Sequence, residues 1–339
     1  MNPISTFNDI LSTVDTDSLS LTDYGRLSLS RLLKAYQYYV DIYQRSLDMI
    51  LERCGLAPSE MTIVDFGGGP GILSMLAKCL GFARVIYVDH NQQAVDAMNA
   101  LADKVGFRPD DVVVGDADAL RDWCVANTVK PNALLGMDVI EHIYVIDDFV
   151  AAIHAISPSV RMVFTTSSTP YNSRVVRHLH KAMLLDENGT AKKMGFRQMR
   201  RDHIKAAYPD MSDRELDYWA DNTRGLIYAD VLRAVETQSP NLLLDQYNTC
   251  DPATGSWTER ILPIDDYRHL LMPYGFSLTV MPGFYNEHRH GIKAVASRHY
   301  NKRIASGYYA HPEGMRQRRR YRKALSVAPF IYLIVNPES

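Results

Sequence analysis

One segment, VDFGGGPG at Val64–Gly71, constrains the fold more than any other part of the chain. Apolar residues and Asp65 precede three consecutive glycines, and an apolar stretch, Ile72–Leu80, follows. This order predicts a buried strand, a sharp turn and a helix, because glycine reaches the backbone conformations of such a turn and lets a ligand approach the main chain. We therefore expect a nucleotide-like ligand to bind over this turn.

The spacing of the glycines narrows the choice of ligand. From Asp65, the glycines Gly67, Gly69 and Gly71 give D-x-G-x-G-x-G, whereas a dinucleotide site needs G-x-G-x-x-G and a P-loop needs a lysine. The next apolar run ends at Asp89, 22 residues after the first glycine, about where an acidic side chain accepts hydrogen bonds from ribose hydroxyls. The ligand is therefore expected to carry a ribose and to lack a bridging pyrophosphate.

Four successive motifs resemble those of the class I S-adenosylmethionine (SAM)-dependent methyltransferases of the small-molecule type: VDFGGGPG, RVIYVDHN, VVVGDADAL and MDVIEHI. The resemblance covers about residues 61–168 and resumes from 260 to the C-terminus. It implies SAM as the cofactor and S-adenosylhomocysteine as its product. Two positions depart from the family pattern. Asn132 stands where an acidic residue often opens the fourth strand, and Pro70 removes one backbone donor from the glycine turn.

The resemblance also implies roles for residues at the strand ends. The glycines would pass close to the methionine part of SAM, Asp89 would bind the ribose, and Asp116 and Ala117 would contact the adenine. Taken alone, Asp89 and Asp116 are equally typical of helix N-caps or turns. The expected cofactor residues are Asp65, Gly67, Gly68, Gly69, Gly71, Asp89, His90, Asp116, Ala117 and Asp138.

Short apolar strands alternate with helical patterns from Met61 to Ser168, which predicts an α/β, doubly wound, Rossmann-like sheet. The resemblance implies seven strands with an antiparallel last strand. We expect the long link Asn286–Ala328 to fold as helix outside the sheet. The strands are expected at Thr62–Phe66, Arg84–Asp89, Asp111–Gly115, Ala133–Asp138, Arg161–Thr166, Phe276–Phe284 and Pro329–Val335, with a helix at Ile264–Met272.

We expect three parts along the chain. Residues 1–58 form an N-terminal helical cap, 59–170 together with 259–339 form the SAM-binding core, and 171–258 form a helical insertion. The cap should contain one amphipathic helix over Leu29–Leu51. Its tyrosines Tyr36, Tyr39 and Tyr43 either face the cofactor cleft or pack in the core.

The insertion is expected to be a lid that shapes the acceptor site and excludes water, and a homodimer contact is its alternative role. Helices are expected at Arg174–Leu185, Arg197–Ala207 and Ser212–Val235. The last of these opens with Ser212 and Glu215, the pattern of a capping box.

Methyl transfer by in-line SN2 displacement asks mainly for alignment of the acceptor. His142, just beyond the fourth strand and next to Glu141, is the leading candidate for a general base, and ordering of the cofactor loop is its alternative role. Other candidate bases are Tyr171, His178 and His180.

The same segment offers a candidate metal site. Asp138, Glu141 and His142 resemble a metal-binding E-x-x-E-H pattern of some methyltransferases. Metal-independent relatives share the E-H pair and no fourth ligand is evident, so we expect no metal.

The sequence thus predicts a SAM-dependent methyltransferase of a small or medium-sized metabolite, with oxygen as the first choice of methylated atom. The alternatives are N- or C-methylation of a metabolite, methylation of nucleic acid, and a non-catalytic SAM-binding regulatory protein. MDVIEH replaces the [DN]PP[YF] with which similar enzymes hold a flipped base, which argues against nucleic acid. Aromatic residues in the insertion favour a true acceptor pocket. Candidate acceptor contacts, suited to an anionic acceptor, are Arg174, Arg177, Arg260 and Tyr285.

Composition supports these expectations. The net charge of −2 and pI near 6.6 disfavour a nucleic-acid partner. Two basic runs, 192–205 and 315–324, are either solvated helix faces or grips for a phosphate or carboxylate. Four scattered cysteines predict reduced thiols. With no long apolar run and no signal-like N-terminus, we expect a cytoplasmic protein without a membrane partner.

Overall fold

The computed structural model describes residues 2–243, 245–308 and 315–338. The chain divides into two compact units. The first comprises Met1–Val139, Asp147–Thr166 and Arg268–Ser339, and the second comprises Ile140–Ile146 and Ser167–Tyr267. The second unit contains the expected insertion, extends beyond it on both sides, and takes in the short segment that follows the fourth strand.

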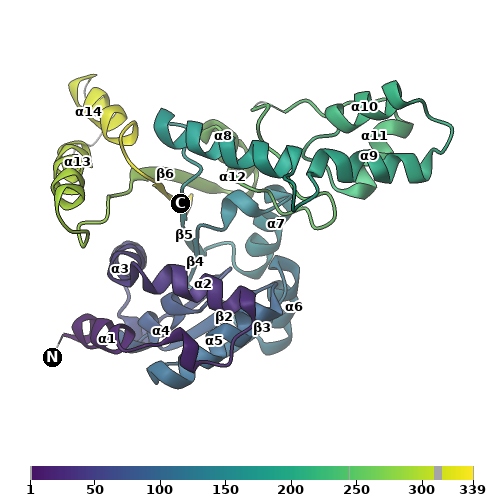
Figure 1. The fold of residues 1–339 in the computed structure, drawn as a ribbon. Helices are drawn as coiled ribbons and strands as arrows, with labels where there is room; N and C mark the ends of the chain where they lie inside the picture. The colour runs from purple at the N-terminus through teal and green to yellow at the C-terminus, as the bar shows by residue number, and fades with distance from the viewer. Residues whose placement is uncertain (1, 244, 309–314, 339) are drawn as a thin grey trace. The chain divides into compact units, whose positions relative to one another are not determined.

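A seven-stranded sheet with the order β3-β2-β1-β4-β5-β7-β6 forms the centre of the first unit (Figure 1). The first five strands run parallel, and β7 is antiparallel to both of its neighbours. The predicted α/β sheet with an antiparallel last strand is confirmed. The strands are β1 (Thr62–Phe66), β2 (Arg84–Asp89), β3 (Asp111–Val114), β4 (Ala133–Met137), β5 (Arg161–Thr166), β6 (Phe276–Pro282) and β7 (Ile331–Pro337).

Successive residues of the buried strands face opposite sides of the sheet, and helices cover both sides. Ile63 of β1 joins a core built with α3, α4 and α5, whereas Phe66 makes an edge-to-face ring contact with Phe149 of α7, 5.0 Å between centroids. The helices of this part are α3 (Tyr36–Cys54), α4 (Ile72–Cys79), α5 (Gln92–Val105), α6 (Ala117–Asn127) and α7 (Ile146–Ile156). Short 3-10 turns are η1 (Thr16–Ser18), η2 (Pro58–Glu60), η3 (Ile140–His142) and η4 (Met272–Tyr274).

The N-terminal part contains three helices: α1 (Pro3–Ser12), α2 (Asp23–Leu33) and α3. The prediction of one helix over Leu29–Leu51 is wrong, because the backbone leaves the helical conformation at Ala35 (φ −141°, ψ 31°). The two pieces have different partners, since α2 packs on α5 while α3 packs on α4, β4 and β5. The apolar pattern continues through the break because both pieces bury residues in the same core.

The link between β6 and β7 is helical, as predicted. It contains α13 (Ile292–Tyr308) and α14 (Met315–Leu325), which lie side by side and both contact β6 (Figure 1). Before β6 the chain forms α12 (Ile264–Leu271) and then η4.

The second unit is helical, with α8 (Ser173–Asn188), α9 (Phe196–Ala207), α10 (Asp213–Asn222) and α11 (Tyr228–Glu236). The expected single helix over Ser212–Val235 is wrong. Gly225 interrupts it with φ 79°, and a Cβ there would meet the Trp257 ring at 2.8 Å. The capping box is confirmed, because the Glu215 carboxylate accepts from the Ser212 amide at 3.0 Å and the Glu215 amide donates to the Ser212 hydroxyl at 3.3 Å.

The helices of this unit have a hydrophobic core of their own. Its members come from α9, α10 and α11, and they are Ile204, Leu216, Trp219, Val231 and Val235. Within the described residues of the whole chain, no helix is both long and apolar enough to span a bilayer.

Candidate active site

The glycine turn between β1 and α4 depends on left-handed backbone at Gly67 (φ 66°), Gly69 (φ 50°) and Gly71 (φ 76°). Its amides already have acceptors. The Gly67 and Gly68 amides donate to the Val88 carbonyl at 2.8 and 3.1 Å, and the Gly71 amide donates to the Gly68 carbonyl at 2.9 Å. The Gly69 amide donates to Asp89 Oδ2 at 2.9 Å, and proline has no donor. The turn from Gly67 to Gly71 therefore has no amide left to donate to a phosphate.

What the turn provides is close access to its backbone. A Cβ on Gly68 or Gly71 would lie 2.6 Å from Tyr87 or 2.3 Å from Met98, so packing alone requires these glycines. At Gly69, by contrast, a Cβ would meet nothing within 4 Å. The Tyr87 hydroxyl fixes this residue by donating to the Gly69 carbonyl at 2.6 Å. The open side of Gly69 is the place where a ligand can lie against the main chain.

Asp89 lies at the end of β2, beside the open glycine, and is only 7% exposed. Its Oδ1 accepts from the Asn91 amide at 2.8 Å, and its Oδ2 accepts from Gly69. Each carboxylate oxygen has a second lone pair, so the oriented carboxylate can still accept from two ribose hydroxyls. The donor and acceptor set thus fits SAM. The neighbouring His90 is 81% exposed, with Nδ1 3.9 Å from Asp89.

Asp65 and Asp116 both have structural partners. Asp65 is buried and accepts from the Ser74 hydroxyl at 2.6 Å and the Ser74 amide at 3.0 Å, which ties β1 to α4. Burial raises the pKa of this carboxyl to about 6, against the lowering effect of the Ser74 hydrogen bonds. Asp116 is the N-cap of α6, where its Oδ1 accepts from the Asp118 and Ala119 amides. Cofactor contacts of Asp65, Asp116 and the neighbouring Ala117 stay predictions.

Asp138 follows β4 with a left-handed backbone (φ 51°), which is uncommon for a residue with a side chain and typical of functional sites. Its amide donates to the Thr165 carbonyl and hydroxyl, both at 3.1 Å. Burial, and next the charge of Asp138, raises the pKa of Tyr38 and Tyr39 on α3. Two helix α3 tyrosines therefore lie near the end of β4, while Tyr43 is buried in the core.

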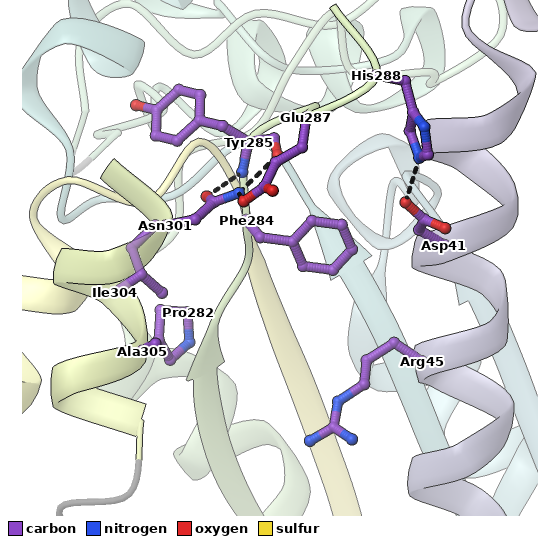
Figure 2. A pocket seen from close by; sticks show the side chains of 10 residues that line it. All are labelled: Asp41, Arg45, Pro282, Phe284, Tyr285, Glu287, His288, Asn301, Ile304 and Ala305. Carbon is purple, nitrogen blue, oxygen red and sulfur yellow. Dashed lines mark hydrogen bonds and ion pairs between the residues drawn. The ribbon is translucent and has the colours of Figure 1, made fainter. Parts of the chain in front are cut away.

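A pocket of about 490 Å³ lies between α3, the segment after β6 and α13 (Figure 2). Asn301 of α13 holds that segment through hydrogen bonds of 2.7 and 2.9 Å with the Tyr285 main chain. Across the pocket, His288 Nε2 lies 2.7 Å from Asp41 Oδ2. Since β6 runs parallel to β5, it ends at the same sheet edge as β1 and β4. The pocket therefore lies at the edge that carries the glycine turn.

The second unit contains a separate cluster of Glu141, His142 and Glu259, whose candidate ligand atoms all lie within 4.8 Å of one another. His142 Nδ1 lies 2.8 Å from the Trp257 carbonyl. Because a carbonyl can only accept, Nδ1 carries the proton and Nε2 keeps its lone pair. Glu259 accepts from the Ser168 hydroxyl at 2.6 Å. The cluster can take up a proton next to two carboxylates, and its atoms would also suit a divalent cation.

Arg260 belongs to the same region of the second unit. Its guanidinium lies over the Trp257 ring, 4.6 Å from the centroid, and donates to the Tyr144 carbonyl at 3.3 Å. Burial lowers the pKa of Arg260. A half-buried guanidinium over the Trp257 ring suits an anionic group of an acceptor.

The remaining candidates are dispersed. His180 lies 3.0 Å from Asp245 and stacks on Tyr247, and these contacts hold its ring in place. Tyr171, Arg174, Arg177 and His178 are exposed. Tyr285 donates through its hydroxyl to the Val327 carbonyl at 2.8 Å.

The sequence analysis missed Glu259 and Trp257. Both residues lie near His142 in the fold but 115 or more positions from it in the sequence, and no local sequence motif predicts this proximity.

Residues 45–138 match the family model described as ribosomal protein L11 methyltransferase (PrmA). Ribosomal protein L11 methyltransferase of Shewanella pealeana is 39% identical over 105 residues, 24% of this chain and 35% of the relative. That of Aeromonas hydrophila is 39% identical over 82 residues, 24% and 28% of the two chains. The match thus spans about a third of the length of these relatives.

Solved structures overlap more of the chain at lower identity. A putative sarcosine dimethylglycine methyltransferase from Galdieria sulphuraria covers 100% of this chain and 99% of its own, at 9% identity and a TM-score of 0.43. A chain in the Haloferax volcanii complex of the Trm112 methyltransferase activator with a putative methyltransferase covers 88% and 92%, at 11% identity and a TM-score of 0.42.

The glycine turn, the strand order and the family match together confirm the predicted class: the chain contains the core of a class I SAM-dependent methyltransferase. The cofactor of this core is SAM.

Proposed function

We propose that this protein transfers the methyl group of SAM to a small or medium-sized metabolite, at an oxygen atom. The observation that carries the proposal is the open backbone at Gly69 beside the oriented Asp89 carboxylate. When bound, SAM supplies an activated methyl group. The task left to the protein is to align the acceptor and to remove its proton.

His142 is the proposed general base. Its Nδ1–H donates to the Trp257 carbonyl, so Nε2 is the atom that takes the proton from an acceptor hydroxyl. Glu141 and Glu259 lie close enough to stabilise the imidazolium that forms. In the sequence, only three residues separate His142 from Asp138, which follows β4. Arg260 is the proposed contact for an anionic acceptor.

The pocket of about 490 Å³ supports a small acceptor, because ligand pockets of proteins commonly measure a few hundred to about a thousand Å³. Its lining carries both signs of charge, from Asp41 and Glu287 and from Arg45 and His288. We propose that it holds the distal part of the acceptor.

A bulky Ala305→Trp variant should raise KM for the acceptor without changing the Kd of SAM. Ala296→Trp, on the same helix but outside the pocket, is the control.

A protein acceptor is the second candidate, because the matched relatives are named for ribosomal protein L11. That match ends at residue 138, before His142, Glu259 and the segment after β6. The residues that we assign to the acceptor therefore have no counterpart in it. We also propose that the protein acts in the cytoplasm, which the four free thiols support. A homodimer formed through the insertion is a further part of the proposal.

Calorimetry with SAM and S-adenosylhomocysteine tests the cofactor site. Asp89→Ala should weaken SAM binding about tenfold or more, because a charged acceptor to hydroxyls contributes roughly 1.5–3 kcal/mol. Asp116→Ala is the matched comparison at the adenine end. If the Asp89 variant binds SAM like the wild type, the ribose assignment is wrong.

Turnover of a panel of hydroxyl, amine and carboxylate metabolites, and of ribosomal protein L11, tests the acceptor. His142→Ala should keep the affinity for SAM and slow turnover about a hundredfold or more. His178→Ala, an exposed histidine of the same unit, should leave turnover unchanged. Full activity of His142→Ala would refute the base, and loss of activity in a chelator would assign Glu141, His142 and Glu259 to a cation instead.

A further inference from the structure

The two-helix link α13–α14 is the most positively charged part of the molecule. Residues 286–328 contain eleven lysines and arginines and two acidic residues, Glu287 and Glu313, whereas the whole chain contains 37 basic and 39 acidic residues. The rest of the chain is therefore acidic, with 26 basic against 37 acidic residues. The net charge of −2 conceals this separation, so it does not exclude a polyanionic partner.

Eight cations of this link are exposed and have no carboxylate partner among the described residues. These eight make no ion pair or side-chain hydrogen bond with any described residue: Lys293, Arg298, Lys302, Arg303, Arg319, Arg320, Arg322 and Lys323. Packing holds the helices together instead, through buried residues such as Ile304 and Leu325. No carboxylate among the described residues offsets the mutual repulsion of these cations. Such a surface is expected to bind a polyanion.

The arrangement on α14 favours nucleic acid over a membrane surface. At about 100° per residue, Arg318, Arg320 and Lys323 with their neighbours cover more than half of the helix circumference. The other side holds Tyr321, whose hydroxyl donates to the Val280 carbonyl, and the buried Ala324 and Leu325. A helix that lies on a bilayer needs an apolar face directed at the lipid, and α14 directs its apolar face at the protein.

Most of these cations are arginines, whose planar forks match phosphate oxygens in two-point contacts. We propose that the α13–α14 link is a docking surface for nucleic acid, which it binds through the phosphate backbone. This surface lies apart from the proposed methyl-transfer chemistry and does not depend on it.

Fluorescence anisotropy of the full-length protein with a labelled RNA hairpin, a DNA duplex and a single-stranded RNA tests the proposal. Binding should be independent of base sequence, with a Kd of roughly 10⁻⁶–10⁻⁴ M near physiological salt, and should weaken steeply as salt rises. The three ligands distinguish RNA from DNA as the source of the phosphates. No binding of any of them at about 0.1 mM protein overturns the proposal.

Two variants with the same change in net charge distinguish the effect of this surface on binding from the effect of the overall charge of the protein. Arg319→Glu/Arg320→Glu/Arg322→Glu should weaken binding at least about tenfold, because at least three phosphate contacts are replaced by repulsion. Lys104→Glu/Lys181→Glu/Arg214→Glu changes the net charge equally at exposed sites elsewhere and should stay within twofold of the wild type. Unchanged calorimetric SAM binding confirms that both variants are folded. Equal losses in both variants, or binding to anionic phospholipid vesicles but not to nucleic acid, would refute the docking surface.

Discussion

Two segments of this chain are dense in positive charge, and the structure uses them in opposite ways. In α9, Arg200 lies 2.5 Å from Glu187, Arg197 lies 2.6 Å from Asp221, and Arg201 lies 2.7 Å from Asp213. Along α13 and α14, eight exposed cations have no such partner among the described residues. One basic run is thus part of the internal structure of its unit, and the other is available to a partner.

The two basic segments differ in their neighbours in the fold. Acidic residues from other helices pack against α9, and a search of the sequence for runs of charge does not include them. The carboxylates that neutralise α9 come from α8 and α10, which pack against it. The helices α13 and α14 pack mainly on each other, and both are basic. Whether a basic run binds a partner is therefore decided by the charge of its neighbours in the fold.

The largest effect should come from removing the buried cation of α9. Arg200 is fully buried, and its guanidinium also donates to the Ala220 carbonyl at 2.9 and 3.1 Å. Arg200→Met should lower the free energy of unfolding by about 3–5 kcal/mol, because it removes the nearer cation of the buried Glu187 carboxylate and leaves only Arg224, whose Nε lies 3.4 Å from Glu187 Oε1. Urea denaturation followed by the fluorescence of Trp219 and Trp257 measures the second unit directly.

Two further variants isolate the cause of that loss. Arg322→Met, on α14, removes an exposed guanidinium that pairs with no described residue, and it should cost little. Arg200→Met/Glu187→Leu removes both buried charges and should recover part of the stability. If the double variant is less stable than Arg200→Met alone, the Glu187 carboxylate still stabilises the fold through Arg224 and Thr249, and its lost pairing with Arg200 does not explain the effect.

Asp65 extends the comparison to a buried carboxylate that has no cation beside it. Burial raises its pKa from 3.8 to about 6, so the folded state binds the proton more tightly than the unfolded state. Its stabilising contribution is complete below about pH 4 and is lost as the pH rises through about 6, a change of about 3 kcal/mol.

Asp65→Asn should remove this dependence. The difference in unfolding free energy between wild type and Asp65→Asn, measured by denaturation at several pH values, should decline between about pH 4 and pH 6. Asp116→Asn, at an exposed N-cap, is the control for a general effect of lost charge. A constant difference for Asp65→Asn would show that the carboxyl is ionised throughout.

The sequence predicted the sheet and the glycine turn well because their signals are local. Strand, glycine turn and helix follow one another within Thr62–Cys79, and strand β2 ends at Asp89 as expected. The failures arise where neighbours in space decide. The break at Ala35 and the interruption at Gly225 depend on which surfaces each helix packs against. Likewise Glu259 reaches His142 from a distant segment, and the partners of Arg200 lie on other helices.

A smaller effect is expected for the exposed pairs of α9. Arg197 makes a two-point contact with Asp221, at 2.6 and 3.1 Å, on the surface of the second unit. A double-mutant cycle with Arg197→Ala and Asp221→Ala should give a coupling energy of about 0.2–1 kcal/mol that shrinks as salt screens the charges. A coupling energy as large in high salt as in low salt would mean that this pair behaves like the buried pair of Arg200 and Glu187, which salt does not screen.

Neutralisation of α14 should have the smallest effect on stability. The sign of the change in unfolding free energy shows whether its arginines stabilise the fold. Arg319→Gln/Arg320→Gln/Arg322→Gln removes cations that repel one another and stabilise nothing among the described residues. The free energy of unfolding of the first unit, followed by Trp123 fluorescence, should stay within about 0.5 kcal/mol of the wild type or rise slightly at low salt. A clear loss of stability would mean that these arginines serve the fold as those of α9 do, and the contrast between the two basic segments would disappear. Unchanged stability together with weakened binding of nucleic acid would assign the charge of α14 to a partner rather than to the fold.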